Sequence, residues 1–78
     1  MNTLDNGTTE ILVFKTDIKL EDFIKLQTLL NNLPGILQWN LDTEDIDNVL
    51  RIESTDVDSN KIINLISQAG YYCQELPD

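Results

Sequence analysis

Residues 20–41, LEDFIKLQTLLNNLPGILQWNL, contain the change of hydrophobic period that decides the fold. Apolar residues first recur at spacings of three and four, which gathers most of them on one helical stripe. They are Leu20, Phe23, Ile24, Leu26, Leu29, Leu30 and Leu33. Pro34-Gly35 ends this pattern, and apolar and polar residues then alternate from 37 to 41, as in a half-buried strand. The segment predicts a helix over 20–33 followed by a strand.

Strand patterns lie on both sides of this segment. The continuous apolar run 11–14 predicts a central strand, because both faces of the strand are apolar. After a polar turn at 43–48, alternation over 49–53 predicts a third strand that forms a hairpin with the second.

A second helix and a last strand complete the chain. Asp58 or Ser59 can cap a helix that ends at Gly70, and residues 71–76 are aromatic enough for a strand. The order β-α-β-β-α-β predicts an α+β ferredoxin-like sandwich, with a four-stranded antiparallel sheet and both helices on one face. We expect a flexible N-terminal tail over 1–9 and one domain over 10–78.

Charge restricts the partners of this domain. Fourteen acidic residues against five basic ones give a net charge of −9, and there is no histidine. Such a field repels phosphate backbones and anionic lipids, so we expect no nucleic-acid and no membrane partner. A protein partner is expected to be basic or neutral. Neither an apolar run of about 20 residues nor a secretory signal is present, which predicts a cytoplasmic location.

The helix end Leu33-Pro34-Gly35-Ile36, the following Trp39/Leu41 strand and the later segment 66–71, ISQAGY, resemble the heavy-metal-associated domain family. Its members are small copper chaperones and the metal-binding modules of metal-pumping ATPases, and the resemblance covers roughly residues 10–76. The family binds Cu(I) or Zn(II) through a Cys-x-x-Cys pair at the start of the first helix. Two thiolates are soft ligands, and the helix N-terminus stabilises their charge.

This cysteine pair is missing from the chain. Alignment on Pro34-Gly35 places Lys19 and Asp22 at the cysteine positions, whereas alignment on Ile18 as the loop hydrophobe places Leu20 and Phe23 there. The sequence leaves both alignments open. Neither pair is a soft donor set, so we expect the family's metal site to be degenerate and no cofactor to be bound. With Leu20 and Phe23 at these positions, an apolar cap replaces the metal loop.

Two weaker metal sites remain as alternatives. Cys73, the single thiol, is most simply a small buried residue, and it would hold Cu(I) only in a symmetric pair of chains. The acidic run Asp42, Glu44, Asp45 and Asp47 offers oxygen ligands for Ca²⁺ or Mg²⁺. A calcium loop of the helix–loop–helix type needs glycine at its sixth position, where Asp47 stands, so we favour a solvated hairpin tip.

The sheet face opposite the helices is the first candidate for an interaction surface, because the predicted fold leaves it uncovered. Either Ile11, Val13 and Val49 or the alternate set Leu12 and Phe14 must lie there. Apolar residues on this face predict a protein partner or a homodimer. The candidate interaction residues are Ile11, Val13, Trp39, Val49 and Arg51.

The sequence gives further expectations for three aromatic residues and one ion pair. Trp39, on an edge strand, is either a core anchor under the helices or a partly exposed contact for a partner. Arg51 is expected to pair with Glu53. One of Tyr71 and Tyr72 should pack under the helices while the other is exposed.

No catalytic constellation is visible, since the chain lacks histidine, a serine beside a base and a glycine-rich phosphate loop. The first hypothesis is therefore a non-catalytic protein-interaction module without a metal site. The alternative is metal-ion binding or trafficking through Cys73 in a dimer or through the acidic hairpin.

Overall fold

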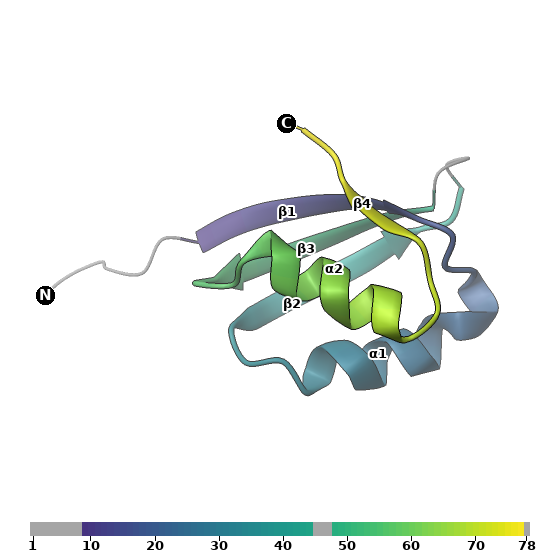
Figure 1. The fold of residues 1–78 in the computed structure, drawn as a ribbon, viewed down its shortest axis with the longest axis horizontal. Helices are drawn as coiled ribbons and strands as arrows, with labels where there is room; N and C mark the ends of the chain where they lie inside the picture. Colours follow the sequence, from purple (N-terminus) through teal and green to yellow (C-terminus); the bar gives the residue numbers. More distant parts are fainter. Residues whose placement is uncertain (1–8, 45–47, 78) are drawn as a thin grey trace, which may run out of the picture.

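The sheet and helices follow the expected order (Figure 1). The computed structural model describes residues 9–44 and 48–77. The elements are β1 (Thr9–Thr16), η1 (Leu20–Asp22), α1 (Phe23–Asn31), β2 (Ile36–Asp42), β3 (Val49–Thr55), α2 (Ser59–Gln68) and β4 (Cys73–Glu75). The strands lie in the order β2-β3-β1-β4 and every neighbouring pair is antiparallel, with both helices on one face. The prediction of an α+β ferredoxin-like sandwich is confirmed.

The ends of three elements differ from the sequence-based boundaries. β1 begins at Thr9, because its pairing with β3 extends from Thr9 opposite Thr55 to Lys15 opposite Val49. The expected first helix starts as a 3₁₀ turn, closed by a 2.9 Å bond from the Asp22 amide to the Lys19 carbonyl. Residues 1–8, most of the expected tail, lie outside the described residues.

β4 is shorter than expected because two amides before it bond elsewhere. The Tyr71 amide donates to the Ile66 carbonyl at 3.2 Å, which extends the end of α2. The Tyr72 amide donates to the Asp17 carboxylate at 2.9 Å. The sheet ladder with β1 therefore begins only at Cys73, opposite Thr16.

Residues at the helix ends set the turns as the sequence indicates. Asp58 caps α2, with its carboxylate accepting from the Asn60 amide at 2.9 Å. Gly35 has a φ of +94°, and a Cβ there would lie 2.7 Å from the Thr55 carbonyl oxygen. The Gly35 carbonyl in turn accepts from the Thr55 amide at 2.8 Å, so the turn after α1 requires glycine.

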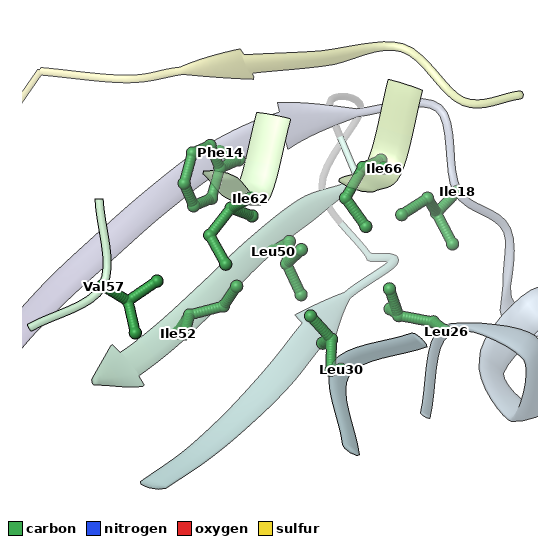
Figure 2. Packing of buried hydrophobic residues seen from close by; sticks show 9 residues of the cluster. All are labelled: Phe14, Ile18, Leu26, Leu30, Leu50, Ile52, Val57, Ile62 and Ile66. Atoms are coloured by element: carbon green, nitrogen blue, oxygen red, sulfur yellow. The ribbon is translucent and has the colours of Figure 1, made fainter. Parts of the chain in front are cut away.

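A single apolar core lies between the sheet and the helices (Figure 2). It is formed by Phe14, Ile18, Leu26, Leu30, Leu50, Ile52, Val57, Ile62 and Ile66. Phe14 and the half-buried Leu12 face the helices, so Ile11 and Val13 lie on the opposite sheet face. This decides between the two sets that the sequence allowed. In the part of the chain that is described, no helix is long and apolar enough to cross a membrane.

Candidate functional site

The loop between β1 and η1 is fixed by hydrogen bonds to the β2–β3 hairpin. The Thr16 hydroxyl accepts from the Ile18 amide at 3.1 Å and donates to the Asn48 carbonyl at 2.7 Å. The Asn48 side chain donates to the Ile18 carbonyl at 2.8 Å. Ile18 is fully buried in the core. These bonds join residues about thirty positions apart, so the sequence alone gave no sign of them.

Apolar side chains are exposed directly after this buried residue. Leu20 is 68% exposed, Phe23 39% and Ile24 70%. Their spacing of three and four residues puts them along the same end of the helical segment. We call these three residues the α1 patch. The Phe23 ring lies 5.0 Å from the Trp39 ring, with an interplanar angle of 38°, so the side chain at the edge of the patch is held in place.

The other pair of candidate positions is polar. Lys19 is exposed and precedes η1 as its N-cap, and Asp22 is half-buried. An Asp22 carboxylate oxygen lies 3.4 Å from the Lys19 amide nitrogen. Lys19 and Asp22 are therefore used to start the 3₁₀ turn.

Carboxylates next to the α1 patch in the sequence interact with the two tyrosines. Burial raises the pKa of Tyr71 above its ordinary value, and a hydrogen bond to Asp22 and the charges of Asp22, Asp17 and Glu21 raise it further. Tyr71 packs against the core whereas Tyr72 is 51% exposed, which confirms the expectation that they differ in burial. Three carboxylates of the segment that carries Leu20 thus act on the Tyr71 hydroxyl.

Lys25 is held between α1 and the end of α2. Its ammonium lies 5.2 Å from the centre of the Tyr71 ring and 3.5 Å from the Ala69 carbonyl oxygen. The carbonyl and the face of the ring both attract this cation. The Lys25 ammonium therefore points toward the end of α2 and the Tyr71 ring.

Cys73 is only half-buried, on β4. Burial raises its pKa to about 11, so at neutral pH the group is a thiol. A metal ligand must be the thiolate, which this environment disfavours. Within residues 9–44 and 48–77, no three acidic or cysteine side chains come together as a metal site.

The acidic hairpin is described only in part. An Asp42 carboxylate oxygen accepts from the Glu44 amide at 3.0 Å, which is a local turn interaction. Asp45 and Asp47 lie outside the described residues.

The predicted interaction residues are divided between the two faces of the sheet. Ile11, Val13, Val49 and Arg51 lie on the uncovered face, and of these Ile11 is 48% exposed. Trp39 pairs with the buried Ile52 and packs against the core on the helix side.

The expected pairing of Arg51 with Glu53 is wrong. Glu53 accepts a hydrogen bond from the Gln38 side chain across the β2–β3 pair. No ion pair of Arg51 is found in the part of the chain that the structure describes. Arg51 lies instead between Val13 and Asn40 in the sheet register.

A scan against models of protein families finds no match, and a search of curated proteins finds none either. Among solved structures, the chain is similar to the apo form of the HMA (heavy-metal-associated) domain of the copper chaperone for superoxide dismutase. The TM-score is 0.73 at 15% sequence identity, covering 99% of this chain and 76% of that one. The chain has the fold of a heavy-metal-associated domain. At this identity the likeness concerns the fold.

Proposed function

We propose that this chain is a non-catalytic protein-interaction module, in which the heavy-metal-associated fold is kept and its soft-metal site is replaced by apolar side chains. The observation that carries the proposal is the contrast between the fully buried Ile18 and the exposed Leu20 and Phe23. A buried loop hydrophobe favours the alignment on Ile18. That alignment places Leu20 and Phe23 at the two cysteine positions of the family.

The chemistry of these side chains supports the loss of metal binding. Leucine and phenylalanine have no donor atom, and a soft ion needs at least two thiolate or imidazole ligands at such a site. In the other alignment, Lys19 would bring a positive charge to a cation. The single thiol, Cys73, is on the last strand and has a raised pKa of about 11. The chain therefore offers few ligands for a soft metal ion.

Interaction with a protein is the function that remains. A lack of catalytic groups in the sequence and the large exposed apolar residues of the α1 patch both favour it. The net charge of −9 favours a basic or neutral protein over nucleic acid or an anionic membrane. The cytoplasmic location stays a prediction.

Equilibrium dialysis with Cu(I) under reducing conditions and with Zn²⁺ tests the proposal. We expect no submicromolar binding by the unaltered chain. The double variant Leu20→Cys/Phe23→Cys should gain binding, because it restores a Cys-x-x-Cys pair at the start of the helix. The matched variant Lys19→Cys/Asp22→Cys has the same spacing and should bind more weakly.

Submicromolar binding by the unaltered chain that is lost on Cys73→Ser would instead support the metal-binding alternative. Calcium dialysis in the same series tests the acidic hairpin. Stronger binding by the Lys19→Cys/Asp22→Cys variant than by the other would overturn the alignment on Ile18.

A further inference from the structure

The α1 patch consists of large apolar side chains that the fold leaves exposed. Leu20 and Ile24 are 68% and 70% exposed, although leucine and isoleucine are usually buried. At 3.6 residues per turn, Ile24 lies roughly 160° around the helix from the core residue Leu26, so neither the sheet nor α2 covers it. Phe23 is fixed against Trp39 at 5.0 Å between the ring centres. The ring at one edge of the patch therefore has a defined position before a partner binds.

The border of the patch carries three carboxylates together with one exposed lysine, Lys19, which directly precedes Leu20. Asp17, Glu21 and Asp22 lie in the same short segment as Leu20, and all three act on the hydroxyl of Tyr71. Asp17 is fixed by its bond to the Tyr72 amide at 2.9 Å. Lys25, a neighbouring cation, is directed to the Ala69 carbonyl and the Tyr71 ring. Asp17 and Glu21 are exposed whereas Asp22 is half-buried, so the first two carboxylates are the ones open to cations of a partner.

The charge of the chain distinguishes between the partners that could bind to the α1 patch. A second copy of the chain would bring the same three carboxylates against these ones, on top of a net charge of −9 per chain. An anionic membrane would be repelled in the same way. A protein segment with apolar side chains next to lysine or arginine satisfies both parts of the surface.

The geometry points to the α1 patch as the docking site for a basic amphipathic helix of a partner protein. Leu20, Phe23 and Ile24 would contact its apolar face, and Asp17, Glu21 and Asp22 its lysine or arginine side chains. A helix fits because the patch is itself a short ridge of helical side chains, against which another helix packs. This inference rests on the proposed function and names its surface and the chemistry of its partner.

The inference is tested by titrating the isotope-labelled full chain with defined peptides. The amide chemical shifts of the chain report the binding. The probes are two synthetic peptides of about 18 residues, long enough to form a helix, with the same leucine stripe and either lysine or glutamate elsewhere. The lysine peptide should shift the amides of residues 17–25 and 71–72, with an affinity that falls as salt is raised. The glutamate peptide should not bind.

Matched variants separate the apolar and the charged contributions. Leu20→Ser/Ile24→Ser should weaken the lysine peptide at least about tenfold, since two exposed contacts are removed without touching the core. Ile11→Ser removes an apolar residue that is 48% exposed on the uncovered sheet face and should leave the affinity unchanged. Asp17→Asn/Glu21→Gln should lower the affinity and flatten its salt dependence, while an oxygen remains at residue 17 for the Tyr72 amide.

Four results of the peptide titrations would overturn the inference. They are shifts centred on Val13 and Arg51, an unchanged affinity in Leu20→Ser/Ile24→Ser, absence of lysine-peptide binding, and equal binding of the glutamate peptide. A dimer seen by light scattering that dissociates in Leu20→Ser/Ile24→Ser would assign the patch to a second copy, which also overturns it. Failure here leaves the dialysis result untouched, so the docking surface and the proposed function fail separately.

Discussion

The uncovered sheet face and the start of α1 are both open to solvent, but they differ in how apolar side chains are exposed. On the sheet face, Val13 and Val49 are half-buried and Ile11 is 48% exposed, with Arg51 and the Gln38–Glu53 hydrogen bond among them. At the start of α1, Leu20 and Ile24 are exposed by about 70% each. A face left uncovered by the topology can be adapted to water by its polar residues. The stronger candidate for a contact with a partner is therefore the α1 patch.

The first test of this contrast compares two residues that precede α1. Ile18→Ala removes a fully buried side chain and should lower the free energy of unfolding by about 2–5 kcal/mol. Leu20→Ala, two positions later, should change it by no more than about 0.5 kcal/mol. Urea denaturation of both variants measures this. A similar loss in both would mean that Leu20 is part of the core and that the α1 patch is not free for a partner.

The second test concerns the contact that holds the patch. Trp39→Ala should cost about 2 kcal/mol, less than a fully buried tryptophan, because the side chain is half-buried. A double-mutant cycle with Phe23→Ala should give a coupling of about 1 kcal/mol for the two rings. The cycle for Gln38 and Glu53 on the uncovered face is the matched control and should give no more than about 0.5 kcal/mol, since that pair is exposed. Equal coupling energies in the two cycles would mean that the α1 patch is held no more rigidly than the uncovered sheet face.

Much of the fold followed from periodicity. The Pro34-Gly35 boundary, the central position of β1 and the edge position of β2 were predicted because they depend on local sequence and on the order of elements. The start of α1 was not, because the bonds of Thr16 and Asn48 that fix the preceding loop join distant segments.

Exposure of Ile24 was missed, although a signal for it was present. Seven apolar residues between 20 and 33 were assigned mainly to one stripe, but the α1 segment buries only Leu26 and Leu30. Ile24 precedes Leu26 by two residues and so points away from it on a helix. The exposure of Leu20 and the contact of Phe23 with Trp39 depend on tertiary packing and needed the structure.

A third test examines β3 on the side that faces the helices. The Ser54 hydroxyl is fully buried and has no hydrogen-bond partner among residues 9–44 and 48–77, which is unfavourable for a polar group. Ser54→Ala should therefore raise the free energy of unfolding by about 1 kcal/mol, whereas Arg51→Ala on the uncovered face of the same strand should leave it nearly unchanged. Thermal and urea unfolding measure both. Destabilisation by Ser54→Ala would show that this hydroxyl is paired in solution.

The smallest effect is expected at alkaline pH. The pKa of Cys73 is raised from 9.0 to about 11 in the folded chain, so the folded state holds the proton more tightly than the unfolded state. This contribution to stability is complete below pH 9 and is lost as the pH rises through about 11. The raised pKa of Tyr71 acts in the same direction above its ordinary range. Urea unfolding at a series of pH values should show less alkaline loss in Cys73→Ala, and an identical profile would contradict the assignment.

The proposed loss of the metal site at the start of α1 is tested most directly by amide chemical shifts during a Cu(I) titration under reducing conditions. We expect the signals of residues 17–23 to stay unchanged in the unaltered chain and to shift in Leu20→Cys/Phe23→Cys. A chelator-reversible shift of these signals in the unaltered chain would mean that a soft ion binds there, in contradiction to the replacement of the metal site by the α1 patch.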